Sequence, residues 1–251
     1  MAKLSSIVKL EGTIDDITFV KTQDGYRARK ASRVSASTIA SSPSFQRTRE
    51  NMAEFGRAGK AGRVLRQAFS TLVKSAKGKR VIARLVKEMM KAIKADKVNA
   101  RGMRNVVDGE LGFLKGFEFN NGASLKDTLS VVFTSSIDRA TGIATVEVPS
   151  LVPTETITVP EGATHYRLVC GAAEIDFENE TYQTDIKQSP YLPWTAATAP
   201  ALSLSANVPA ASTHPLFLVV GVQFFQEVNG TYYTLKTGEH NALSLVKVDN
   251  S

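Results

Sequence analysis

A phosphate-binding loop is the first chemistry that the residue types suggest, because of the glycines and lysine of Gly56-Arg57-Ala58-Gly59-Lys60-Ala61-Gly62. A nucleotide-binding loop of this kind needs four residues between its glycines, Ser or Thr after its lysine, and a strand before it. Here the spacing differs, Ala61 follows the lysine, and the segment lies inside a helical pattern. The sequence therefore does not predict a nucleotide site.

Metal ligands and nucleophiles are few and scattered. His165, His214 and His240 share no ligand spacing with one another or with Cys170. Cys170 lies in an apolar run that is typical of a small buried side chain. No Gly-x-Ser-x-Gly motif marks a catalytic serine. We therefore expect no enzyme, no catalytic or metal site and no cofactor.

Charge divides the chain into two parts of opposite sign. Residues 1–110 contain 24 Lys/Arg and 10 Asp/Glu, a net charge of +14, whereas residues 111–251 contain 7 and 14, a net charge of −7. This asymmetry indicates an anionic partner for the first part, such as nucleic acid, a membrane surface or an acidic protein face. The acidic face can belong to another copy of the chain.

Within the first part, a predicted helix carries a basic face. Its members are Arg80, Arg84, Lys87, Lys91 and Lys94. Such a face can be merely solvated, can dock on an acidic protein surface, or can neutralise the phosphates of nucleic acid.

An acidic strip follows in the second part. It consists of Glu174, Asp176, Glu178 and Glu180. On a strand, alternation places all four carboxylates on one face. That face can be solvated, can bind calcium if its oxygens converge, or can receive the basic helices of a neighbouring copy. The last contact is heterologous and generates rings or filaments when repeated.

Three predicted domains position these residues. Residues 1–43 form a β-hairpin arm and connector, with apolar residues from Ile7 to Val20 and a turn at Asp24-Gly25. Residues 44–112 form a basic helical region. Residues 113–251 form a β-sandwich domain, where the apolar period changes to two. The fold class is therefore α+β, with an N-terminal β-hairpin and a basic helical hairpin before an immunoglobulin-like antiparallel β-sandwich.

The elements of the last two domains follow from periodicity. One helix is expected from Ser44, as its N-cap, to about Leu72, a second over about Arg80–Asp96 and a third over about Asn99–Val107. The turn between the first two is placed at Ala76-Lys77-Gly78-Lys79. Strands are expected near Leu129–Phe133, Ile143–Val148, Glu155–Val159, His165–Cys170, Ala173–Asn179, Leu202–Ala206, Leu216–Val228, Thr231–Lys236 and Leu243–Val248.

Two segments of the chain resemble the opening of a bacterial protein family that has no established activity. They are Leu10-Glu11-Gly12-Thr13-Ile14 with Ile17-Thr18-Phe19 and Asp24-Gly25-Tyr26, and Phe45-x-Arg47-Thr48-Arg49-Glu50-Asn51-x-x-Glu54-Phe55-Gly56 with Ala58-Gly59-Lys60-Ala61-Gly62. The resemblance covers residues 10–70. It implies a shared front joined to a divergent β-rich rear, with no activity to transfer.

This shared segment is expected to be an assembly interface. Its candidate residues are Phe19, Tyr26, Phe45, Arg47, Arg49, Glu50, Asn51, Glu54, Phe55, Gly56, Gly59 and Gly62. The three glycines predict close backbone packing or a local break in the helix. Glu50 and Glu54, with Arg47 one turn earlier, predict a charge network along the helix.

The sequence thus predicts a self-assembling structural subunit of a filament, a tube or a phage-related particle, and so a homo-oligomer. The alternative is a nucleic-acid-associated protein that binds through its basic helices. A third class is a β-domain that binds carbohydrate or a cell-surface partner. Its aromatic candidates are Tyr182, Tyr191, Trp194, Tyr232 and Tyr233. Without a secretion signal or an apolar run of about 18 residues, we expect a cytoplasmic protein with no membrane partner, unless lysis or a dedicated machine releases it.

Overall fold

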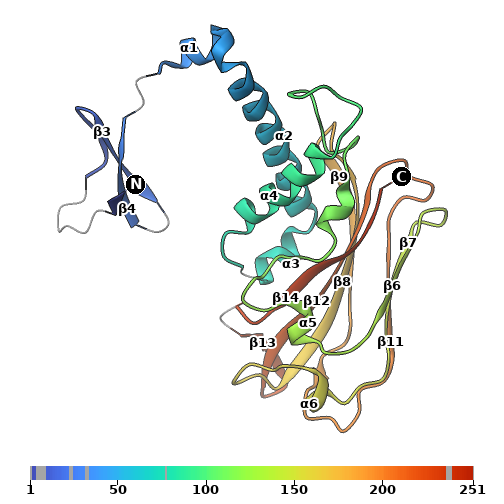
Figure 1. Cartoon of the computed structure of the whole chain (residues 1–251). Coiled ribbons are helices and arrows are strands. Elements are labelled where there is room, and N and C mark those ends of the chain that lie inside the picture. Colours follow the sequence, from blue (N-terminus) through green and yellow to red (C-terminus); the bar gives the residue numbers. More distant parts are fainter. Residues whose placement is uncertain are drawn as a thin grey trace. The chain divides into compact units, whose positions relative to one another are not determined.

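The computed structural model of the chain describes residues 2–3, 10–22, 25–31, 34–76, 78–235 and 239–250 (Figure 1). The chain divides into two compact units, Met1–Asn51 and Met52–Ser251, each described by itself. Both helices and antiparallel sheets are present, which confirms the α+β class.

The first unit is built on a small antiparallel sheet in the order β1-β4-β3-β2. Its strands are β1 (Ala2–Lys3), β2 (Gly12–Ile14), β3 (Ile17–Thr22) and β4 (Gly25–Lys30). Thr22 of β3 pairs with Gly25 of β4, so the predicted hairpin is confirmed. Ile7 and Asp24, on which that prediction partly rested, lie outside the described residues.

The connector after this sheet contains a helix that we did not predict, α1 (Ala36–Ser41). Ser35 caps it, because its hydroxyl accepts a hydrogen bond from the Thr38 N–H at 3.1 Å. The predicted N-cap at Ser44 is wrong: Pro43–Phe45 form one 3-10 turn, and the long helix begins only after it. Proline favours the first position of a helical turn, where no N–H is needed.

The long helix is α2 (Gln46–Ala68), and the boundary between the two units falls within it. Its three glycines do not break it, so of the two predicted alternatives the local break is wrong. A Cβ at Gly56 or Gly59 would meet nothing within 4 Å, whereas one at Gly62 would lie 3.5 Å from Leu85. Close packing is therefore present at Gly62 alone of these three positions.

Two further helices complete the helical layer of the second unit. They are α3 (Ser70–Ser75) and α4 (Val81–Lys94), the latter within two residues of its predicted bounds. Lys77, in the predicted turn, lies outside the described residues. Gly78 has a close packing partner, since a Cβ there would lie 2.0 Å from the Phe119 carbonyl oxygen.

The predicted third helix is wrong, because Asp96 organises residues 97–110 into turns. Its buried carboxylate accepts hydrogen bonds from the backbone N–H groups of Val98, Asn99 and Asn105 at 2.8 to 3.0 Å. The Asn99 side-chain amide donates a fourth bond, at 3.0 Å. Burial alone would raise the pKa of Asp96, but these bonds outweigh it and lower the pKa to about 2.

Removing this carboxylate charge in the variant Asp96→Asn is expected to destabilise the second unit by about 2 kcal/mol at pH 7. Because the folded pKa is depressed, the stabilisation is complete above the unfolded pKa of about 4 and disappears as the pH falls towards 2. Urea unfolding of both proteins at pH 7, 5, 4 and 3 tests this, with Glu155→Gln as a control for net charge. A gap between wild type and variant that is constant across these pH values would contradict it.

The second unit contains two antiparallel sheets. The larger has the order β10-β8-β12-β14-β5, with β9 paired to β8 and β13 paired to β12. Its strands are β5 (Phe117–Glu118), β8 (His165–Asp176), β9 (Thr181–Gln188), β10 (Leu192–Pro193), β12 (Leu216–Val228), β13 (Thr231–Thr234) and β14 (Ala242–Asp249). The smaller has the order β11-β7-β6, formed by β6 (Thr134–Asp138), β7 (Ile143–Val148) and β11 (Leu202–Asn207).

Three layers result, because the central strands of the large sheet are buried on both faces (Figure 1). Val169 and Phe217 on one face pack with the core of the helices. Leu168 and Leu218 on the other face pack with the small sheet. The predicted immunoglobulin-like sandwich is not confirmed, since helices cover one face of the large sheet.

Two predicted strands do not form, and short helical turns lie directly before the first and at the start of the second. Leu125–Thr128 and Pro153–Thr156 form α5 and α6, and between the expected strands at 129–133 and 155–159 only the single bridge Leu129–Ile157 remains. Pro153 favours the start of a helical turn. The expected strands at 165–170 and 173–179 are instead the one strand β8, which ends at Asp176.

Candidate assembly interface

One face of the sheet in the first unit is mostly apolar. Its register pairs Ile14 with Ile17, Phe19 with Ala28, and Lys21 with Tyr26. Directly paired residues share a face, and side chains alternate along each strand. The apolar side chains of Ile14, Ile17, Phe19, Tyr26 and Ala28 therefore lie on one face together with Lys21 and Lys30, and we call this face the arm face. Thr18, Val20, Arg27 and Arg29 lie on the other.

The described residues of the first unit do not bury the arm face. Among the described side chains of residues 10–51 none is buried, and Ile14 and Ile17 are 59% and 47% exposed. A small sheet without a core is marginally stable in water, and a contiguous exposed apolar surface marks a site of interaction. Phe19 and Tyr26 were expected at such a site. Ile14 and Ile17 were missed as candidates, although Ile17 stands two residues before Phe19 and so lies on the same face of the strand.

The first turns of α2 form hydrogen bonds with the connector that precedes them. Arg49 donates to the backbone carbonyls of Ile39 and Ser42, both at 2.8 Å. Arg47 pairs with Glu50 at 2.9 Å, as expected for neighbours on one helix face. Of the other candidates here, Phe45 is half-buried and Asn51 is exposed.

Glu54 requires a correction, because its side chain is 1% exposed and is held inside its own chain. Its carboxylate accepts two hydrogen bonds from Arg104, at 2.7 and 2.9 Å, and one from the Gly102 N–H at 2.8 Å. These bonds, chiefly the pair with Arg104, lower its pKa despite burial. A subunit that docks on α2 would meet Phe55 instead, which is 60% exposed beside the open positions Gly56 and Gly59.

The predicted basic face on α4 is only partly a surface. Arg80, Lys87, Lys91 and Lys94 are exposed. Arg84 is half-buried and donates to the backbone carbonyls of Glu118 and, at 2.8 Å, Phe119, and burial lowers its pKa. Arg84 therefore joins the helix to the sheet.

The predicted acidic strip is wrong as a strand face. Strand β8 ends at Asp176, which accepts the N–H groups of Glu178 and Asn179 at 2.9 and 3.0 Å and so closes a turn. Glu174 is almost fully buried and accepts a hydrogen bond from Ser212. Glu180 pairs with Arg63 and, at 3.5 Å, Lys60 of the same chain. Glu180, the last residue of the predicted strip, thus pairs with basic side chains of α2 in its own chain.

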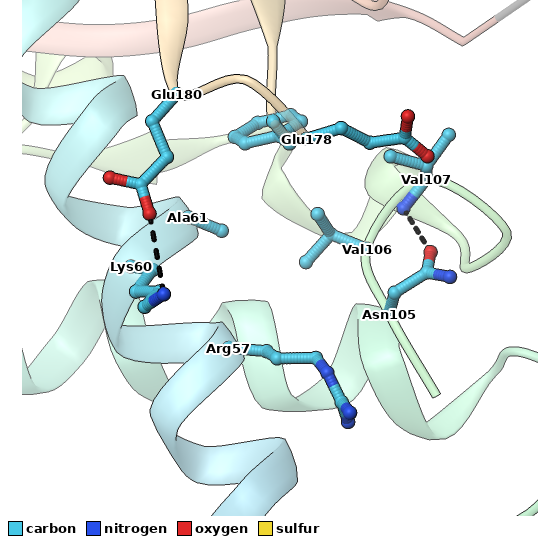
Figure 2. Close-up of a pocket in the computed structure, with 9 residues that line it drawn as sticks. Arg57, Lys60, Ala61, Asn105, Val106, Val107, Glu178 and Glu180 are labelled. Atoms are coloured by element: carbon cyan, nitrogen blue, oxygen red, sulfur yellow. Dashed lines mark hydrogen bonds and ion pairs between the residues drawn. The ribbon is translucent and has the colours of Figure 1, made fainter. Parts of the chain in front are cut away.

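Figure 2 shows the cavity beside that contact, about 260 Å³ in volume, between α2, the loop around Val106 and the turn after β8. Ala61, Val106 and Phe177 supply its apolar lining, and Arg57, Lys60, Glu178 and Glu180 its charges. Arg57 already donates to the carbonyls of Gly102 and Arg104 at 2.7 and 3.2 Å. Because both cations have partners within the chain, the cavity does not point to a ligand.

Some of the aromatic side chains considered for carbohydrate binding already make contacts within the chain. The rings of Tyr191 and Tyr232 stack on each other with centroids 4.1 Å apart. The indole N–H of Trp194 donates to the Ala163 carbonyl at 2.8 Å. Tyr182 and Tyr233 remain exposed but do not by themselves define a sugar platform.

Across the described ranges, no three His, Cys, Asp or Glu side chains are grouped so that they would hold a metal ion. In the same part of the chain, no helix is both long and apolar enough to cross a membrane. Family models, curated proteins and solved structures yield no match to the chain. A function must therefore be supported by the geometry of the arm face and of the surfaces that it can meet.

Proposed function

We propose that the protein is a self-assembling structural subunit whose N-terminal sheet docks on another copy of the chain. The observation that carries this proposal is the arm face, a mostly apolar sheet surface in a unit where none of the described side chains of residues 10–51 is buried. Sheets need packing against a second layer to be stable. A neighbouring subunit supplies that layer in a filament, a tube or a phage-related particle.

Charge supports a second copy as the partner. Residues 1–51 contain 9 Lys/Arg and 5 Asp/Glu, a net charge of +4, whereas residues 111–251 carry −7. Opposite surface potentials favour association between unlike parts of two copies. Contact between two different surfaces is heterologous, so it repeats from copy to copy and extends the assembly.

Negative-stain microscopy and light scattering of the purified full chain test the proposal across a salt series, with and without nuclease. Ordered particles are expected at low salt, and their mass should fall as salt screens the attraction. Nuclease should not change them. A monodisperse monomer at every salt and protein concentration would refute self-assembly.

The exposed lysines of α4 favour one alternative, a nucleic-acid-associated protein. A monomer that forms particles only when nucleic acid is added would support it. Charge reversal at Lys87 and Lys91 should then abolish retention on DNA or RNA. Arg84 is unsuitable for this test, because it holds the carbonyls of Glu118 and Phe119.

A further inference from the structure

The outer face of the small sheet carries an open groove of about 480 Å³. It crosses the sheet where β6 begins, β7 ends and β11 begins. The residues that line it are Val132, Thr134, Glu147, Val148, Pro149, Ala201, Leu202 and Ser203. Glu147 is the single charged residue. Val132, Pro149 and Ala201 are the exposed apolar ones, because Val148 is buried in the core beneath the sheet and Leu202 is half-buried against it.

Two exposed side chains, those of Val132 and Glu147, distinguish this groove from an ordinary solvated sheet face. Val132 at its rim is 88% exposed, more than any other large hydrophobic side chain among the described residues. Glu147 is exposed and accepts a hydrogen bond from the Thr134 hydroxyl at 3.3 Å. No cation of the described residues lies within ion-pair distance of it. The groove thus offers an apolar surface with one carboxylate.

The arm face has the complementary pattern. Lys21 pairs with Tyr26 and Lys30 pairs with Ile17, so both lysines lie on the arm face beside its apolar side chains. An apolar surface flanked by lysines matches an apolar groove that contains a carboxylate.

We infer that this groove receives the arm face of a second copy, with a lysine of the arm, Lys21 or Lys30, opposite Glu147. The inference rests on the proposed function and names the surface that the arm binds. Packing the arm face over the groove buries Ile17 and Phe19 of one copy against Val132 of the next. Repetition of this contact adds one sheet layer outside each small sheet.

Disulfide trapping between two separately purified variants tests the contact. Ile17→Cys and Val132→Cys, mixed under mild oxidation, are expected to give a cross-linked heterodimer. Thr18→Cys is the matched control, because its side chain lies on the opposite face of the same strand. The native Cys170 is buried and does not compete. Equal cross-linking of both arm variants to Val132→Cys, or none, would overturn the inference.

Charge exchange provides a second readout that does not depend on thiols. The single variants Lys21→Glu and Lys30→Glu identify the lysine that lies opposite Glu147. The variant that brings a second carboxylate next to Glu147 should raise the protein concentration needed for assembly about five- to tenfold. Glu147→Lys should do the same, and combining it with that variant in one chain should restore assembly. Normal assembly of Glu147→Lys, together with loss of assembly in Phe19→Asp, would refute the groove but leave the proposed function intact. A wild-type chain that never assembles would refute both.

Discussion

Replacing Phe19 with Asp is expected to convert assemblies of the protein into monomers. Phe19 pairs with Gly12 on one side and Ala28 on the other, which places it in the middle of the arm face. A carboxylate there would have to lose its water on docking, at a cost of several kcal/mol. The concentration needed for assembly should therefore rise at least about a hundredfold.

Sedimentation velocity measures this change over a range of protein concentrations. Thr18→Asp adds the same charge to the adjacent residue on the opposite face and should assemble nearly as well as wild type. Thermal unfolding of the second unit should be the same in all three proteins, since the substitutions lie in Met1–Asn51. If both variants lost assembly equally, net charge and not the arm face would be responsible.

The strands that could be predicted from sequence are those with strong local signals. Strand β12 (Leu216–Val228) has the predicted bounds, and Asn229-Gly230 follows it as the expected turn to β13. Strand β7 likewise matches Ile143–Val148. Strand β9 was missed, because TYQTDIKQ lies half exposed at an edge and has no apolar alternation.

The sequence could not show which elements pack on each face of the large sheet. Val169 and Leu168 are both fully buried, one against the helices and the other against the small sheet. A continuous apolar run shows that both faces of a strand are buried, but not whether a helix or a second sheet covers each. An immunoglobulin-like sandwich and the three-layer arrangement therefore predict the same pattern along β8.

The acidic strip failed for a local reason that the sequence did contain. Asp and Asn frequently close turns by accepting backbone N–H groups two or three residues later. Asp176 does so, and Glu180 adopts a positive φ of 57° directly before β9. Alternation of charged and apolar residues continues through Asp176-Phe177-Glu178, but the strand itself does not. Turn chemistry outweighs periodicity here.

Glu54→Ala is expected to cause the largest loss of stability of any single substitution considered. Glu54 and Arg104 join α2 to the loop after α4 through two hydrogen bonds, and the Gly102 N–H adds a third. Removing one partner of a buried pair leaves the other charge uncompensated, which typically costs about 3–5 kcal/mol. Urea unfolding followed by circular dichroism measures the loss. Glu50→Ala removes the more exposed pair with Arg47 and should cost less than about 1 kcal/mol.

The double variant Glu54→Leu/Arg104→Met separates packing from charge at the same site. Replacing both partners of a buried pair by apolar side chains of similar size leaves no charge unpaired, so most of the lost stability should return. The double variant also separates stability from assembly. Because Glu54 is enclosed by its own chain, the Glu54→Leu/Arg104→Met variant should, once stably folded, assemble at the wild-type concentration. If it folded stably but did not assemble, Glu54 or Arg104 would belong to the interface after all, and the arm face would not be its only contact.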